Sequence, residues 1–140
     1  MRTQLAAMFL SAGVAATALS ATALAGPSPV TGSIDLASDL SRSSVPEYGD
    51  DVAFSTVVTG RMESKAYTYI TTVCQQDGRV VYQWSSRDLS FAFPLVDQDG
   101  QGLEWVGGAA KCEAALVYRV DRKNAATIQT LDSVAFEVSG

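Results

Sequence analysis

Apolar and polar residues alternate along much of the chain after residue 50, and this period of two constrains the fold more than any other feature. In the stretch DVAFSTVVTG, which starts at Asp51, Val52 and Phe54 share one face with Thr56 and Val58. Successive side chains of a β-strand point to opposite faces, so this pattern predicts a strand with one buried face. The stretch AYTYITTVC follows the same logic. In AAKCEAALVYRV the residues expected to point inward are Cys112, Ala114, Leu116, Tyr118 and Val120, with Lys111, Glu113 and Arg119 outward.

Further strands are predicted around Ile34 and Leu36, in LSFAFPL and in SVAFEV. Asp77-Gly78 separates two β-rich runs and suits the positive φ angles of a two-residue hairpin turn. No segment after residue 25 sustains a helical period. We therefore predict an all-β fold, a two-sheet sandwich of about seven antiparallel strands. The residues expected inside from the last two stretches are Leu89, Phe91, Phe93, Leu95, Val134, Phe136 and Val138.

Residues 1–25 are typical of a cleavable signal peptide. Arg2 is their only charge, residues 5–24 are small or apolar, and Ala23-Leu24-Ala25 offers the small residues that signal peptidase requires. The alternative is an uncleaved membrane anchor, since about 20 apolar residues can span a bilayer. We expect cleavage, a flexible segment at 26–32, a single domain at 33–140 and a secreted, extracellular product.

The charge balance argues against two classes of partner. Without Arg2 the chain has nine basic and fifteen acidic residues, a net charge of −6, and the charges are scattered. Nucleic acids and anionic membrane surfaces attract clustered Lys and Arg, so neither is expected to bind. The partner we expect is a protein or a cell surface of unknown identity.

Cys74 and Cys112 are the only cysteines. In an exported chain such a pair most often forms a disulfide, because the compartment is oxidising. A redox site would favour the spacing CxxC, and a zinc site would need further Cys or His, whereas the chain has no histidine. A disulfide would place the two Cα atoms roughly 4.4 to 6.8 Å apart.

Three motifs together resemble the immunoglobulin-like β-sandwich domains of small exported bacterial proteins: CQQDGRVVYQW, WVGGAAKCEAAL and LDSVAFEV. The resemblance covers residues 66–140. It implies that Cys74 and Cys112 lie on neighbouring strands and bridge, with Trp105 packed near the start of the second strand. In antibody-type domains the first cysteine faces across the sandwich from the second strand. Here the strand that starts at Asp51 precedes Cys74, which favours a bridge within one sheet. The resemblance implies no activity.

The residue inventory excludes most catalytic chemistry. Without histidine there is no Ser-His-Asp or Cys-His machinery and no imidazole-ligated metal, so we predict a noncatalytic protein without cofactor or metal. Carboxylates remain as an alternative: Asp97, Asp99 and Glu104 in DQDGQGLE could hold calcium, although a plain hairpin loop is the stronger interpretation. Asp50-Asp51 is interpreted as a solvated pair at a strand start, with a metal role as the weaker reading.

Four aromatic residues are the candidates for a binding surface. Tyr67 and Tyr69 share one face of their strand, and Tyr82 and Trp84 share one face of the returning strand. The two pairs could form a composite patch for a sugar, a peptide or a protein. The alternative is that one pair packs in the core and the other covers a sheet edge.

The function we predict is a secreted noncatalytic module for protein or surface interaction. The alternative is a small-molecule carrier similar to the apoproteins of secreted antitumour chromoproteins. A flat exposed aromatic face would favour the module, and a large apolar pocket between sheet and loops would favour the carrier.

Overall fold

The structure, a computed structural model, describes residues 29–37 and 45–140. These residues form strands and loops without a helix, which confirms the all-β prediction. The strands are β1 (Thr31–Leu36), β2 (Asp51–Val52), β3 (Phe54–Thr59), β4 (Ala66–Gln76), β5 (Arg79–Ser86), β6 (Phe93–Pro94), β7 (Ala110–Asp121) and β8 (Ala126–Val138).

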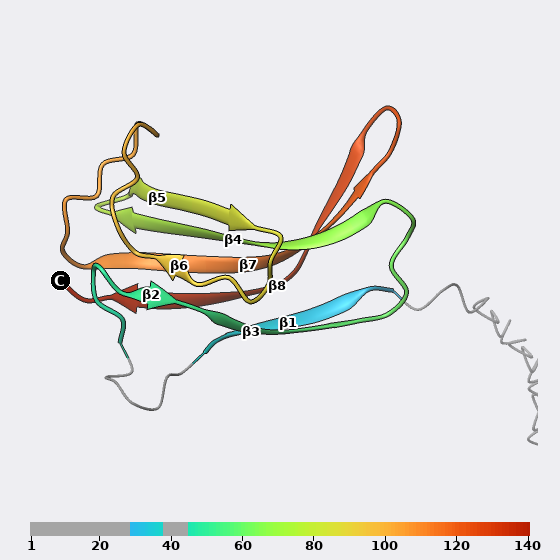
Figure 1. The fold of residues 1–140 in the computed structure, drawn as a ribbon, viewed down its shortest axis with the longest axis horizontal. Coiled ribbons are helices and arrows are strands. Elements are labelled where there is room, and N and C mark those ends of the chain that lie inside the picture. The colour runs from blue at the N-terminus through green and yellow to red at the C-terminus, as the bar shows by residue number, and fades with distance from the viewer. Residues whose placement is uncertain (1–28, 38–44) are drawn as a thin grey trace, which may run out of the picture.

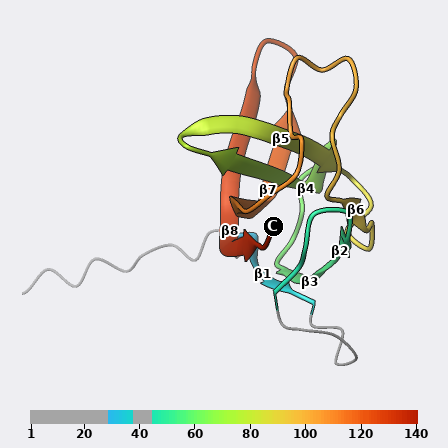
Figure 2. The same cartoon turned by 90° about the vertical axis from the view of Figure 1, so that its left-hand side faces the viewer.

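Four of the strands form one antiparallel sheet in the order β5-β4-β7-β8. The remaining strands form two antiparallel ribbons, β1-β3 and β2-β6. Both ribbons lie on the same side of the four-stranded sheet (Figures 1 and 2). The described residues thus make three sheets where two were predicted, because the run DVAFSTVVTG is interrupted at Ala53. Its first part pairs with β6 and its second with β1.

The main core fills the space between the four-stranded sheet and the ribbons. Ile34, Val52 and Phe54 enter it from the ribbon side, and Ile70 and Leu116 enter it from the sheet. All of the residues expected to point inward from AAKCEAALVYRV are buried. Lys111 and Glu113 are exposed and Arg119 is half-buried, as an outward face requires. The period of two therefore predicted correctly which face of β7 packs inside.

The β7–β8 hairpin is longer than the sequence pattern predicted and projects beyond the end of β5 (Figure 1). Its register shifts between Leu116 and Val117, so that Leu131 on β8 has no partner of its own. Such a bulge adds one residue and breaks the alternation. The alternation of apolar and polar residues predicts a strand only in SVAFEV, after the bulge. It does not predict the first half of β8. In SVAFEV Val138 is buried, whereas Val134 and Phe136 are half-buried.

Strand β1 lies very close to the four-stranded sheet. A Cβ added at Gly32 would be 2.8 Å from Leu116 Cδ2 and 3.1 Å from Leu131 Cδ1. Thr31 and Gly32 pair with Thr59 and Val58, so the strand begins two residues before the predicted domain boundary at 33. This part of the predicted flexible segment 26–32 is ordered β-structure. Residues 26–28 and the predicted signal peptide, 1–25, lie outside the described residues.

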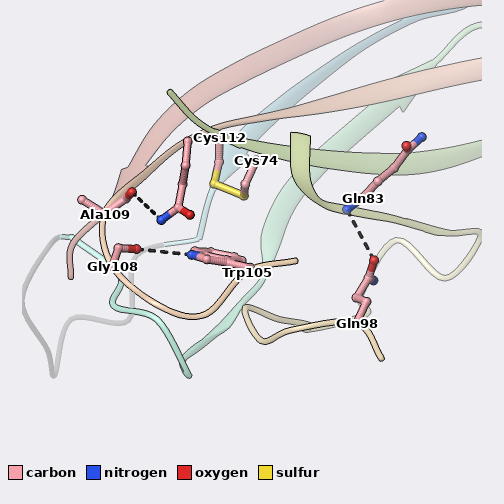
Figure 3. The surroundings of a disulfide bond; sticks show 8 residues. Cys74, Gln83, Gln98, Trp105, Gly108, Ala109 and Cys112 are labelled. Atoms are coloured by element: carbon pink, nitrogen blue, oxygen red, sulfur yellow. Dashed lines mark hydrogen bonds between the residues drawn. A yellow bond between two sulfur atoms is a disulfide. The ribbon is translucent and has the colours of Figure 1, made fainter. Parts of the chain in front are cut away.

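The stretch LSFAFPL is mostly irregular, since only Phe93 and Pro94 are in a strand. The predicted burial is nevertheless right for Phe93 and Leu95, which are fully buried, whereas Leu89 and Phe91 are half-buried and pack against the core. The following loop covers part of the free edge of β5. There the backbone N–H of Gln83 donates to the side-chain oxygen of Gln98 at 3.5 Å (Figure 3). A covered edge strand resists pairing with another chain.

Candidate binding surface

The four candidate aromatic residues do not share one face. Along β4, residues 66 to 76 alternate, and Tyr67 and Tyr69 point to the outer face, away from the ribbons, while Cys74 points to the core. Tyr82 lies opposite Cys74, and Trp84 lies opposite Thr72, which is also buried. The predicted composite patch is therefore not formed.

A single extra residue in the β4–β5 hairpin explains this correction. Asp77 and Gly78 both have positive φ, 49° and 77°, as the predicted two-residue turn requires. A regular hairpin around that turn would place Tyr82 opposite Val73, on the outer face. The register instead shifts between Cys74 and Gln75, and Val81 is the additional residue. A shift of one residue moves every later side chain to the other face.

Tyr82 is a core residue. Its side chain is fully buried and its ring packs edge-on against Trp105 with the centroids 5.8 Å apart. Among the described atoms its hydroxyl finds no hydrogen-bond partner. Burial, with a smaller contribution from the charge of Asp51, raises the pKa of this phenol far above its usual value. Tyr82 therefore stays neutral and cannot present its hydroxyl to a ligand at the surface.

Trp84 is half-buried on the same inner face. Its ring stacks on Phe91 with centroids 6.0 Å apart, and Phe91 in turn packs edge-on against Phe93. This aromatic chain belongs to the core that the ribbons cover. The structure thus agrees with the alternative in which one aromatic pair packs in the core, and that pair is Tyr82 and Trp84.

Tyr67 and Tyr69 remain at the surface, half-buried on the outer face of β4. Their rings lie side by side with centroids 6.1 Å apart. The guanidinium of Arg87, just after β5, lies over the Tyr67 ring at 3.8 Å from its centroid. A cation at this position is attracted by the electron-rich face of the ring.

These residues line an open hollow of about 270 Å³, which we call the tyrosine hollow; its lining is Tyr67, Tyr69, Ser85, Ser86, Arg87 and Arg119. Arg119 enters from β7, opposite Tyr67 in the register. Its Nε donates to Asp121 Oδ1 at 2.7 Å. Ser85 Oγ donates to Thr71 Oγ1 at 3.0 Å, on the outer face beside Tyr69.

A second hollow, of about 520 Å³, continues along the outer face of the same sheet. Its lining is small and mixed: Thr71, Val73, Gln75, Lys111, Cys112, Glu113, Ala115 and Ala135. The outer face is therefore a shallow surface with hydroxyl, amide and charged groups around a floor of small side chains.

The disulfide between Cys74 and Cys112 is formed, as predicted (Figure 3). The two residues face each other on adjacent strands β4 and β7, so the bridge lies within one sheet. Their Cα atoms are 4.0 Å apart, slightly closer than the predicted range. Both cysteines are buried, and Cys112 borders the second hollow from below.

Trp105 packs close to this bridge. It is fully buried, and its indole N–H donates to the carbonyl of Gly108 at 3.3 Å (Figure 3). The side-chain amide of Gln76 donates to the carbonyls of Gly107 and Ala109, both at 3.0 Å. These bonds hold the segment that leads into β7.

The acidic loop is held by its own hydrogen bonds. Asp97 Oδ1 accepts from the backbone N–H of Trp105 at 3.0 Å, and Asp97 N donates to the Tyr48 hydroxyl at 3.1 Å. Asp99 and Glu104 are exposed. At the other predicted acidic pair, Asp50 Oδ2 accepts from the backbone N–H of Glu47 at 2.9 Å, and Asp51 is exposed. Within residues 29–37 and 45–140 no group of three or more His, Cys, Asp or Glu is placed to hold a metal ion.

Arg87 and Arg119 were not among the predicted site residues. The alternation in β7 placed Arg119 outward, but nothing in the sequence paired it with Tyr67. Arg87 follows the end of a strand, where alternation ceases to apply. Comparison with known protein families, characterised proteins and solved structures found no match to this chain.

Proposed function

We propose that this chain is an exported, noncatalytic module of the immunoglobulin-like β-sandwich class, which binds a protein or cell-surface partner through the outer face of its four-stranded sheet. The observation that carries the proposal is the position of Tyr67 and Tyr69. They lie side by side on a sheet face from which both ribbons are absent.

The composition of that face suits recognition. Tyr and Arg are enriched where proteins bind partners, because each combines a large contact area with hydrogen-bonding groups. Tyr67, Tyr69, Arg87 and Arg119 gather in one hollow, and Ser85 and Ser86 complete its lining. The free edge of β5 is partly covered through Gln98, so the face is better suited to contact than that edge.

The packing of the interior favours the module over the small-molecule carrier. A carrier would need an apolar pocket between the sheet and the loops. In the described structure that space holds fully buried side chains, among them Trp105, Tyr82, Phe93 and Leu95. The two hollows on the outer face of the sheet are open and partly polar.

Export is supported by the signal-type leader and by the disulfide, because such bridges persist in oxidising compartments. The described residues contain no helix long and apolar enough to cross a membrane.

The proposal is tested by cosedimentation of the chain from Gly26 onward with cell envelopes of the producing organism. We expect the wild-type protein to pellet with the envelopes and the Tyr67→Ala/Tyr69→Ala variant to bind about tenfold or more weakly, the usual effect of removing central aromatic contacts. Val57→Ala is the control, because Val57 is an exposed apolar residue of ribbon strand β3. Equal binding by all three proteins would contradict an outer-face binding surface.

A further inference from the structure

The tyrosine hollow has an excess of positive charge in a chain that is acidic as a whole. The full chain has a formal net charge of −5. The guanidinium groups of Arg87 and Arg119 line the hollow. Among the described residues, Arg119 forms an ion pair with the Asp121 carboxylate. The lining itself contains no carboxylate, and within the described ranges Asp121 pairs with Arg119 alone.

Arg87 is the arginine of the hollow without a bonded carboxylate. Within the described part of the chain it contacts the Tyr67 ring, and no carboxylate is paired with it. The neighbouring carboxylate, Asp88, is already engaged: its Oδ1 accepts from Ser90 Oγ at 2.6 Å and from Ser90 N at 2.9 Å. These hydrogen bonds lower the pKa of the Asp88 carboxyl.

The contact with Tyr67 holds Arg87 in place for an anion, since its guanidinium carbon lies 3.8 Å from the ring centroid. A guanidinium can donate two parallel N–H bonds to the two oxygens of a carboxylate. The ring reduces the freedom that the side chain would otherwise lose on binding.

The rest of the hollow suits a sugar ring. Ser85 of the lining and Thr71, which lies opposite it, supply hydroxyl groups on the outer face. The Tyr69 ring beside them offers a flat apolar surface for the C–H face of a pyranose. The hollow of about 270 Å³ is shallow and open, and among its lining residues there is no aliphatic side chain. A peptide would instead be anchored by a buried apolar side chain in a desolvated pocket.

We propose that the tyrosine hollow binds a carboxylate-bearing sugar, a uronic acid unit of an acidic polysaccharide. Arg87 binds the carboxylate, Arg119 adds positive charge from the other side, and Tyr67 and Tyr69 support the sugar ring. This inference rests on the proposed function, whose partner it identifies by chemical class.

The test is a titration of the isotope-labelled protein, followed by amide chemical shifts, with trigalacturonate as the probe. Neutral galactotriose and a tri-glutamate peptide are the comparison ligands. We expect trigalacturonate to shift the amides of Tyr67, Tyr69 and Arg87, and we expect weaker binding at higher salt because the site is exposed.

The deciding variants are Arg87→Gln and Arg79→Gln, which change the net charge equally. Arg79 is exposed at the opposite end of β5, outside the hollow. Arg87→Gln should weaken binding of trigalacturonate about fivefold or more, the effect of losing a charge-assisted hydrogen bond at an exposed site, and Arg79→Gln should not. Arg87→Lys should recover only part of the affinity, because lysine lacks the planar fork.

Three results would overturn the inference: no binding of trigalacturonate, equal weakening by both glutamine variants, or binding of tri-glutamate or galactotriose as strong as that of trigalacturonate. Envelope binding that persists in Arg87→Gln but is lost in Tyr67→Ala/Tyr69→Ala would leave the proposed function standing while this inference fails.

Discussion

Two tyrosine hydroxyls next to Trp105 differ in their hydrogen bonding. Tyr48 and Tyr82 both pack edge-on against the Trp105 ring, at centroid distances of 5.0 and 5.8 Å. The Tyr48 hydroxyl donates to the Trp105 carbonyl at 3.0 Å and accepts from Asp97 N at 3.1 Å. The Tyr82 hydroxyl has no partner among the described atoms. The two residues therefore offer a matched pair for measuring the cost of a buried polar group.

We predict opposite effects of removing these hydroxyls. Tyr82→Phe should leave the free energy of unfolding unchanged or raise it by up to about 1 kcal/mol, because a buried group without a partner is removed. Tyr48→Phe should lower it by about 1 to 2 kcal/mol, because two hydrogen bonds are lost. Urea unfolding of both variants measures the difference. A larger loss in Tyr82→Phe than in Tyr48→Phe would show that the Tyr82 hydroxyl is satisfied.

Among the strands, the two β-bulges are the features that the alternation of apolar and polar residues does not predict. The inward residues of β7 and the turn at Asp77-Gly78 follow from local pattern and turn chemistry. The bulge at Val81 does not, because Val80, Val81 and Tyr82 are consecutive apolar or aromatic residues that fit either register. The bulge moves Tyr82 and Trp84 to the core. The bulge at Leu131 similarly hid the first half of β8. Of the four candidate aromatic residues, Tyr67 and Tyr69 lie at the surface, and the two arginines beside them come from β7 and from the segment after β5.

The contact between β1 and β8 includes one polar link. The backbone N–H of Ile34 donates to Asp132 Oδ2 at 3.0 Å, which ties a ribbon strand to the four-stranded sheet. Asp132 is half-buried. Near it, β1 lies so close to the sheet that a Cβ at Gly32 would be 3.1 Å from Leu131 Cδ1. This bond helps to hold the ribbon on the inner face of the sheet.

We predict that Asp132→Ala lowers the free energy of unfolding by about 1 to 2 kcal/mol, since a hydrogen bond to a charged acceptor is lost and the Ile34 N–H is left without it. Asp132→Asn should have a smaller effect, because its side-chain oxygen still accepts. Thermal or urea unfolding of the two variants provides the measurement. Equal losses would mean that the charge, and not the hydrogen bond, matters.

For the whole molecule, the disulfide is the main covalent constraint. It closes a loop with a sequence separation of 38 residues between β4 and β7, the two central strands of the sheet. On the chain-entropy model a loop of this length removes denatured-state entropy worth about 4 kcal/mol. The bridge lies in the core and away from the tyrosine hollow, so its contribution is to stability.

We therefore expect Cys74→Ala/Cys112→Ala to lose about 2 to 5 kcal/mol of unfolding free energy and to keep its far-ultraviolet β-sheet spectrum. Partner binding should fall only as far as folding does. Native, oxidised wild-type protein should show no reactive thiol. A double variant that is fully folded but has lost binding would assign the cysteines a role in recognition.

The central claim is that the outer face of the four-stranded sheet is the binding surface. Amide chemical-shift mapping on the labelled protein, with solubilised envelope material added, tests it most directly. We expect the shifted amides to concentrate at the outward residues of β4 and β7, with the largest shifts at Tyr67, Tyr69 and Arg119. Shifts confined to the ribbons or to the loop between β6 and β7 would contradict it.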